Sequence, residues 1–202
     1  MPHADSPRSY HHGDLREALI GAGLELTRDG GADGLALRDA ARRVGVSPTA
    51  VYRHFADRDA LLSAVAERVQ QRVADGMQVA EPPPSTSARD RLRAVGLGYI
   101  GFALREPGWF DLAFGRPGAL QERIEPDRVP APFAALSAAL DALVAEGALD
   151  AARRPDAEWP CWSAVHGFAL LALGGPLRGV SAEELREAAS RTVDIAIDGL
   201  LA

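Results

Sequence analysis

Several residue types and patterns that define other protein classes are missing from this chain of 202 residues. It has one cysteine, Cys161, so an intrachain disulfide framework is excluded. No apolar run approaches the roughly 20 residues of a membrane span, and the polar N-terminus lacks the apolar centre of a secretion signal. We therefore expect a cytoplasmic protein without a membrane partner. Aromatic residues make up 6% of the chain while Ala and Leu are abundant, which favours helices over sheets.

Lysine is also absent, so all 22 basic residues are arginine. The net charge is −6, which excludes a protein that binds nucleic acid through its overall charge. Residues 1–60 carry 8 Arg and 9 acidic residues, and residues 61–202 carry 14 Arg and 19 acidic residues. Any DNA binding must therefore use a local cationic face made of guanidinium groups.

Apolar spacing, caps and breaks predict an all-α fold of about nine helices. The expected helices cover residues 14–28, 37–44, 48–55, 57–77, 88–105, 109–114, 133–147, 156–173 and 182–201. The start signals are Asp14, the Ser47-Pro48 pair, and Ser181 with Glu184 as a capping box. Proline-rich segments at 82–84 and 126–132 mark loops. We identify no strand and no internal repeat.

The segment LRDAARRVGVSPTAVYRHF, residues 37–55, predicts a helix-turn-helix. Gly45 permits the left-handed backbone that such a tight turn often needs, and the small Ala41 allows the two helices to pack closely. The second helix is expected to expose Thr49, Tyr52, Arg53 and His54, which are suited to base edges and phosphates in a major groove. The alternative is a buried helical hairpin in some other helical protein.

Residues 10–62 resemble the DNA-binding domain of the TetR family of transcriptional regulators over its whole length. The similarity includes the Tyr-x-x-Phe ending at residues 52–55 and the Asp-Arg-Asp that follows at 57–59. It implies a flexible arm at 1–13, a three-helix DNA-binding domain at 14–60, and a helical ligand-binding and dimerisation domain at 61–202. The residues that would contact DNA are Ser47, Thr49, Tyr52, Arg53, His54 and Arg58, with Tyr10, His11 and His12 in an arm near it.

One departure from the family pattern lies at Ala36, where relatives commonly have a Ser or Thr cap. A missing cap costs about 1 kcal/mol, so the second helix is weakened but the motif remains.

The C-terminal half resembles a subset of this family named for a Trp-His-Gly signature, here Trp162, His166 and Gly167. The turn at residues 106–110 resembles that subset as well. From its aromatic residues we expect a pocket lined by Phe102, Trp109, Phe110, Phe114, Trp162 and His166, and an aromatic or lipophilic effector. The alternative for each of them is ordinary core packing. Cys161 precedes Trp162 and is expected to point elsewhere.

Apolar stripes on the last two helices predict a homodimer built as a four-helix interface about a two-fold axis. The stripes consist of Leu170, Leu173, Leu185, Ala189, Val193, Ala196, Ile197 and Leu200. The alternative is that they pack only on their own domain.

These features together predict a sequence-specific, ligand-responsive repressor that binds double-stranded operator DNA as a homodimer. An activator or an effector-independent regulator remains an alternative, as does a helical interaction module. An enzyme is disfavoured because no nucleophile–base pair, carboxylate pair or metal-ligand constellation is present. His11, His12 and Asp14 lack a further nearby ligand, so neither a metal nor another cofactor is predicted.

Overall fold

The computed structural model describes residues 12–78, 86–115 and 129–202. Over these residues the chain forms nine α-helices and no strand, which confirms the predicted all-α fold. The helices are α1 (His12–Thr27), α2 (Leu37–Val44), α3 (Pro48–Val51), α4 (Arg58–Met77), α5 (Ala88–Arg105), α6 (Pro107–Phe110), α7 (Ala131–Ala145), α8 (Glu158–Leu173) and α9 (Ala182–Leu201). Short helical turns lie at Gly31–Gly34, Asp111–Gly115 and Ala151–Arg153.

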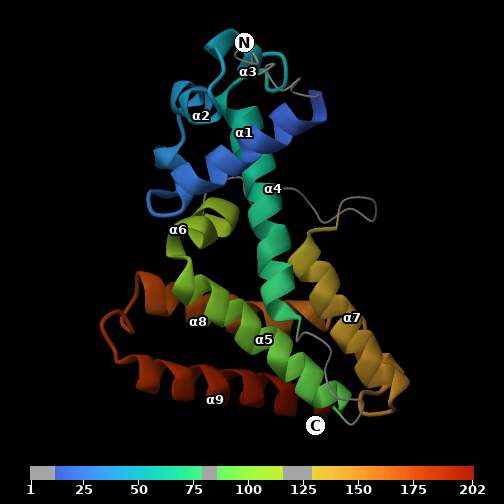
Figure 1. Ribbon diagram of the computed structural model, residues 1–202. Coiled ribbons are helices and arrows are strands. Elements are labelled where there is room, and N and C mark those ends of the chain that lie inside the picture. The colour runs from blue at the N-terminus through green and yellow to red at the C-terminus, as the bar shows by residue number, and fades with distance from the viewer. Residues whose placement is uncertain (1–11, 79–85, 116–128) are drawn as a thin grey trace, which may run out of the picture.

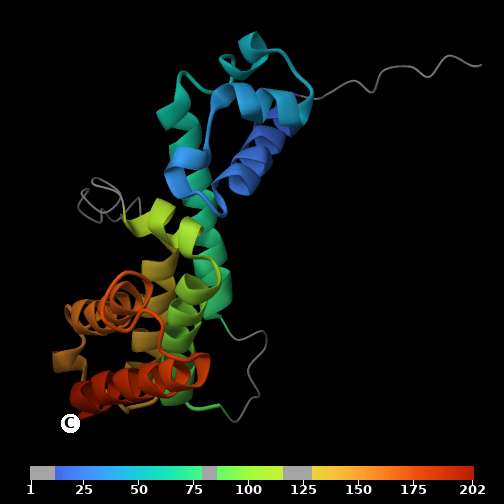
Figure 2. The ribbon, with the colours of Figure 1, turned by 90° about the vertical axis from the view of Figure 1, so that its left-hand side faces the viewer.

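The helices form two groups joined by one long helix. Helices α1, α2 and α3 pack around the first half of α4 at one end of the molecule, as Figure 1 shows. Helices α5 and α7 pack on its second half at the other end, α8 and α9 pack on α5, and α6 lies between α1 and α5. The view in Figure 2 shows the same separation, with α4 bridging the two groups. A conformational change in the group of α5, α7, α8 and α9 can therefore reach the group of α1, α2 and α3 through α4 or α6.

Glycines at two crossings hold α4 tightly between its neighbours. A Cβ on Gly98 of α5 would lie 2.4 Å from the carbonyl oxygen of Gly76, and a Cβ on Gly23 of α1 would lie 2.5 Å from Val65. Both distances are far below van der Waals contact, so only glycine permits the backbones to approach this closely. The two ends of α4 are thereby fixed on different groups of helices.

Several helix boundaries differ from the predicted ones for local reasons. Helix α1 begins at His12 rather than Asp14, which shortens the expected arm by two residues; Tyr10 and His11 lie outside the described residues. Helix α7 begins at Ala131, two residues early, because proline fits a first helical turn, where no N–H is required. Helix α8 begins at Glu158, two residues late, since Asp156 has a φ of 62° and cannot be part of a helix.

The apolar stripe predicted to form the dimer interface is mostly inside the subunit. Ala189, Val193, Ile197 and Leu200 are buried, Leu173, Leu185 and Ala196 are half-buried, and Leu170 is exposed. The reason is visible at Gly96 of α5, where a Cβ would lie 3.2 Å from both methyl groups of Val193. The missing side chain lets α9 pack directly on α5, so the four buried residues of the stripe pack inside the subunit, whereas Leu170 remains exposed.

No helix among the described residues is long and apolar enough to cross a membrane.

Candidate functional site

Helices α2 and α3 meet at the tight turn that the sequence predicts. Gly45 ends α2 with a φ of 76° and a ψ of 31°, and the N–H of Val46 donates to the carbonyl of Ala41 at 3.0 Å. This is a left-handed helix end, which glycine adopts without steric cost. Ser47 begins α3, and its hydroxyl accepts a bond from the N–H of Ala50 at 3.3 Å. The Ser47-Pro48 start signal is therefore confirmed.

The second helix of the motif is shorter than predicted. Regular α-helix ends at Val51, and residues 52–54 continue as a tighter turn in which the N–H of His54 donates to the Val51 carbonyl at 2.9 Å. The Ala36 position has no side-chain cap, as the sequence indicated. Val51 and Phe55 are fully buried and fix the turn to the domain core.

The opposite side of this unit is open to solvent. Thr49 and Arg53 are exposed, and Tyr52 exposes 58% of its surface although it is aromatic. Ser47 is exposed while its hydroxyl acts as the helix cap, and His54 is half-buried. A large amphipathic ring left in water beside an arginine is the arrangement that contacts to sugar and phosphate use.

Most arginines of residues 12–60 are already engaged within the protein. Arg16 lies over the Phe55 ring at 5.2 Å, Arg28 pairs with Glu106, Arg42 with Asp39, and Arg43 with Glu25. Arg58, predicted to contact phosphate, donates from Nε to the Leu35 carbonyl at 2.8 Å and from NH2 to the Ala32 carbonyl. It anchors the turn after α1, so only part of its guanidinium faces outward.

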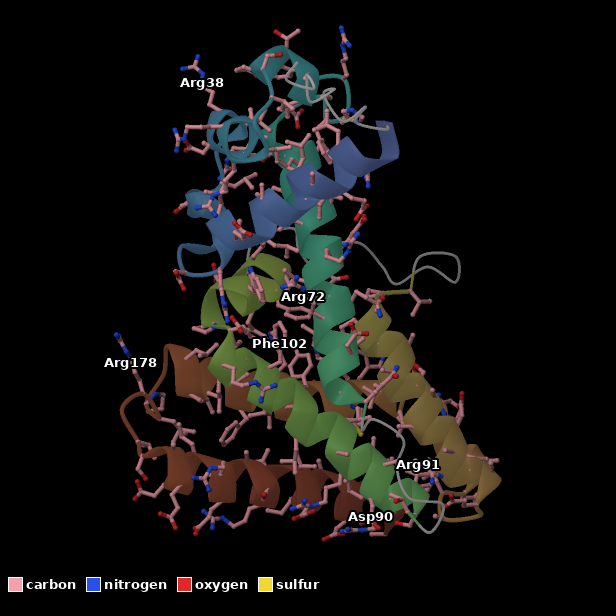
Figure 3. All side chains as sticks on the ribbon, in the orientation of Figure 1. Arg38, Arg72, Asp90, Arg91, Phe102 and Arg178 are labelled. Atoms are coloured by element: carbon pink, nitrogen blue, oxygen red, sulfur yellow. The ribbon has the colours of Figure 1, made fainter. Side chains whose placement is uncertain are left out.

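Two arginines of this region have no ion-pair or hydrogen-bond partner among the described residues: Arg53 and Arg38. Arg38 extends from α2 into solvent, as Figure 3 shows. Arg38 could not be singled out from the sequence, because a helix pattern marks it as a surface residue but does not show that neighbouring carboxylates leave it unpaired. Within the described part of residues 12–60, Arg38 and Arg53 are therefore the candidates for the local cationic face that the acidic composition requires.

Trp109, predicted to line a pocket, instead joins the two groups of helices. Its indole Nε1 donates to the carbonyl of Leu24 on α1 at 2.9 Å. The guanidinium groups of Arg28 and Arg72 lie over its ring, 5.4 and 4.6 Å from the centroid, and Arg72 is seen beside α6 in Figure 3. The prediction failed because an indole has a donor that must be satisfied when buried, and a helix carbonyl supplies the acceptor.

A bidentate ion pair and a close backbone contact complete this joint between α1 and α6. Arg28 donates to both carboxylate oxygens of Glu106, at 2.9 and 2.7 Å. A Cβ on Gly108 would lie 2.2 Å from the Arg28 carbonyl oxygen, so α6 rests directly on the end of α1. Any shift of α6 therefore displaces the end of α1.

Four of the predicted pocket residues gather around a residue that the prediction left out, Tyr99 of α5. The ring centroids of Phe110, Phe114, Trp162 and His166 lie 5.4 to 6.3 Å from that of Tyr99. We call these five side chains the aromatic cluster. The Tyr99 hydroxyl and His166 Nδ1 are 3.0 Å apart, and burial lowers the pKa of His166. Phe102 is elsewhere, buried against α4 near Gly76.

A cavity of about 30 Å³ lies beside this cluster. It is lined by Met77, Leu92, Val95, Gly96, Tyr99, Leu136, Cys161, Trp162, Val165, Val193, Ala196 and Ile197. Of the predicted pocket residues only Trp162 is among them. Cys161 lines the cavity with Trp162, so the expectation that it points elsewhere was wrong. Most of the lining consists of ordinary apolar residues from five helices, and only the packing of those helices reveals that they meet.

Comparison with known proteins assigns both halves of the chain. A family model for bacterial regulatory proteins of the tetR family matches residues 19–65, and one for the tetracyclin repressor-like C-terminal domain matches residues 92–196. The chain belongs to the TetR family. Its helix-turn-helix is thus the DNA-binding unit of a transcriptional regulator, and the family consists of regulators rather than enzymes. The Trp-His-Gly subset remains a prediction.

Curated relatives of this TetR-family chain match it over parts of their length. An HTH-type transcriptional regulator of Mycobacterium tuberculosis is 33% identical over 109 residues, which cover 52% of this chain and 47% of that protein. The class C tetracycline repressor of Escherichia coli is 50% identical over 52 residues, 26% of this chain and 24% of that protein. The chain therefore spans less than half the length of the curated relatives it matches.

Solved structures match nearly the whole chain. A protein of unknown function from Rhodococcus sp. RHA1 is 32% identical and superimposes with a TM-score of 0.74, covering 97% of this chain and 100% of that one. A TetR variant from Acinetobacter baumannii AYE in complex with minocycline is 24% identical, with a TM-score of 0.65 and coverage of 95% and 96%. The second match shows the shared fold alone.

Proposed function

We propose that this TetR-family protein is a cytoplasmic repressor that binds operator DNA as a homodimer and is released by a small molecule. The observation that carries the proposal is the helix-turn-helix surface. Thr49, Tyr52 and Arg53 are exposed on one side of the second helical unit while Val51 and Phe55 anchor its other side. A rigid helix with exposed polar groups is the element that enters a major groove.

The contacts of one subunit are too few to hold an operator. Arg38 and Arg53 are the free cations of the described part of the DNA-binding domain, and the whole chain has a net charge of −6. A two-fold dimer doubles these contacts and lets the helix-turn-helix units of the two subunits bind half-sites about 34–36 Å apart. Dimerisation thus compensates for the small cationic face.

The dimer surface that we propose lies on the outer sides of α8 and α9. Leu170 and Leu171 of α8 expose 48% and 45% of their surface, and Ile195 of α9 exposes 72%. These two helices pack against each other, so their outer sides form one surface. A second copy of the chain would remove these apolar side chains from water, as in the four-helix interface that the sequence favoured.

The switch that we propose runs through α6 and α4. Two adjacent residues of α6 face different groups of helices. Phe110 belongs to the aromatic cluster, and its ring centroid lies 5.1 Å from that of Phe114 and 5.6 Å from that of His166. Trp109 donates a hydrogen bond to the carbonyl of Leu24 on α1. A molecule that rearranges the cluster would shift α6 and with it the end of α1. Such a molecule releases DNA only if it binds the non-DNA arrangement more tightly.

An effector-independent regulator is the second candidate, and the cavity size favours it. Binding sites for drug-sized ligands typically measure 300 Å³ or more, whereas this cavity measures about 30 Å³. The two candidates share the DNA interface and differ only in whether any ligand weakens DNA binding.

The test is a salt-titrated binding assay on the DNA immediately upstream of the protein's own gene. We expect binding that exceeds binding to random DNA and is weakened at least tenfold by Tyr52→Ala. Arg186→Ala is the matched control, because Arg186 is exposed on α9, far from the helix-turn-helix. Equal binding of wild type and Tyr52→Ala at every salt concentration would refute the assigned interface.

A further inference from the structure

The cavity beside the aromatic cluster is placed so that a ligand in it could act on both proposed interfaces. Its lining includes Tyr99 of the aromatic cluster, which contacts Phe110 of α6. It also includes Val193, Ala196 and Ile197 of α9, the helix whose other side carries Ile195. An occupant would therefore touch the joint to the DNA-binding domain and the helix of the proposed dimer surface together.

The cavity wall carries no ionised group. Tyr99 and Cys161 are its residues with reactive polar atoms, and burial raises the pKa of the Tyr99 hydroxyl and of the Cys161 thiol, so both stay protonated. The two charged groups that act on Cys161, Glu158 and Arg154, form an ion pair with each other at 2.9 Å, and Ser137 donates a further bond to Glu158 at 2.8 Å.

The polar pair at the edge of the cavity is neutral as well. The Tyr99 hydroxyl and His166 Nδ1 share one hydrogen bond, and burial favours the uncharged form of both groups. Tyr99 is thereby occupied by His166. A charged ligand would meet no counter-charge in this wall, while an apolar ligand would lose nothing by leaving water.

We propose that this cavity is the effector site and that it takes an uncharged, predominantly apolar ligand, such as a neutral aromatic compound. The inference rests on the proposed ligand-responsive function and gives its effector a chemical class. It excludes effectors whose buried part is ionised, tetracycline included.

The small volume of the cavity requires side chains to move when the ligand enters. Trp162 is half-buried and can turn outward, and Met77 has an unbranched, flexible side chain that adapts to new shapes. Trp162 also packs on Tyr99 and Phe114, with ring centroids 5.4 and 6.0 Å apart. Its displacement opens the site and disturbs the aromatic cluster in the same movement.

The experiment compares two dyes that differ by one charge. N-phenyl-1-naphthylamine is neutral, and 8-anilinonaphthalene-1-sulfonate is the same ring system with a sulfonate. Each is titrated by fluorescence into the wild-type protein, the Ala196→Leu variant and the Ala188→Leu control. Ala196 lines the cavity, whereas Ala188 is half-buried on the same helix outside it. Tetracycline is added as a competitor.

We expect saturable binding of the neutral dye, weakened at least tenfold by Ala196→Leu and unchanged by Ala188→Leu, with no displacement by tetracycline. The sulfonate should bind at least tenfold more weakly. Equal binding of the two dyes with equal sensitivity to Ala196→Leu, or displacement by tetracycline, would overturn the ligand class. Neutral-dye binding that Ala196→Leu leaves unchanged, or its absence, would overturn the site. If Ala196→Leu does not fold, Val165→Ile fills the cavity from α8.

The operator assay separates this inference from the proposed function. Dye binding in the cavity without any effect on DNA affinity would refute the ligand-responsive switch and leave the site standing. DNA binding that Tyr52→Ala weakens, without dye binding in the cavity, would refute the site and leave the DNA-binding regulator standing.

Discussion

The protein has no lysine, so its cationic contacts depend on arginine. Among the described residues near the helix-turn-helix, few guanidinium groups lack an ion-pair or hydrogen-bond partner. In the described part of residues 12–60, Arg38 and Arg53 lack a partner, while neighbours such as Arg43 are held by carboxylates. The sequence predicted the role of Arg53 from its place in the helix-turn-helix. Ion pairing between distant residues, such as Arg43 with Glu25, decided which other arginines remain available, and no sequence pattern reports it.

Replacement of either free arginine by alanine should weaken DNA binding and leave the fold intact. We expect Arg38→Ala and Arg53→Ala each to reduce the slope of log affinity against log salt by about 2 for the dimer, because each removes one phosphate contact from each of the two half-sites. Thermal unfolding should be unchanged, since both side chains are exposed and neither has a hydrogen-bond or ion-pair partner among the described residues. An unchanged salt slope together with unchanged affinity would show that the residue does not face DNA.

His166 should make stability depend on pH on the acidic side of neutrality. Burial lowers its pKa in the folded state below the ordinary value of 6.5, so the unfolded chain binds the proton more readily. Its contribution is therefore present above pH 6.5 and is lost as pH falls from 6.5 towards the folded-state pKa.

Urea unfolding at pH 7.5 and 5.5 measures this effect. The His166→Asn variant is the comparison, because its amide oxygen can still accept the Tyr99 hydroxyl proton but does not titrate. Wild type should lose more stability between the two pH values than the variant. Equal losses would show that His166 is not shielded from water in the folded protein.

Among the helices, the sequence predicted where a helix begins better than where it ends or which other helix it packs against. The capping box at Ser181 and Glu184 begins α9 at the predicted residue, because both of its hydrogen bonds are local. The pocket was misplaced for the opposite reason. Trp109 and Phe110 are neighbours in sequence, yet they serve different groups of helices, and only the position of α6 between α1 and α5 separates their roles.

The joint between α1 and α6 should be sensitive to a single methyl group. A Cβ at Gly108 would lie 2.2 Å from the carbonyl oxygen of Arg28 and 3.2 Å from the carbonyl oxygen of Thr27. The Gly108→Ala variant must therefore push α1 and α6 apart. We expect a loss of about 1–3 kcal/mol in the free energy of unfolding and altered operator affinity.

Gly21→Ala is the matched control, because a Cβ there meets no atom within 4 Å. It should preserve both quantities or raise stability slightly, since alanine favours a helix. Wild-type stability in the Gly108→Ala variant would show that α6 does not rest firmly on α1.

In the molecule as a whole, the proposed two-fold dimer would cover the exposed Leu170 and Leu171 of α8 and Ile195 of α9. The sequence predicted an interface on these two helices, but most of the predicted residues are buried inside the subunit, because an apolar stripe shows that a helix is packed without showing which element covers it. Gly96 allows α9 to pack closely on α5, so most of the predicted stripe is buried, whereas Leu171 and Ile195 remain exposed on the outer sides of the two helices.

Charges on the outer sides of α8 and α9 should therefore separate the subunits. The double variant Leu171→Glu and Ile195→Glu is expected to sediment as a monomer at concentrations where wild type is a dimer, and to bind operator DNA at least a hundredfold more weakly. Trp159→Glu is the control, since Trp159 exposes 52% of its surface near α7. A dimeric double variant would place the interface elsewhere.

The most direct test of the central claim, that this chain reads DNA through its helix-turn-helix as a dimer, is selection from a random pool of double-stranded DNA. Wild type should enrich an inverted repeat whose half-sites lie about one helical turn, or a multiple of it, apart. The Tyr52→Ala variant should enrich nothing or a changed half-site. Enrichment of no sequence by wild type, or of the same sequence by both proteins, would contradict the account.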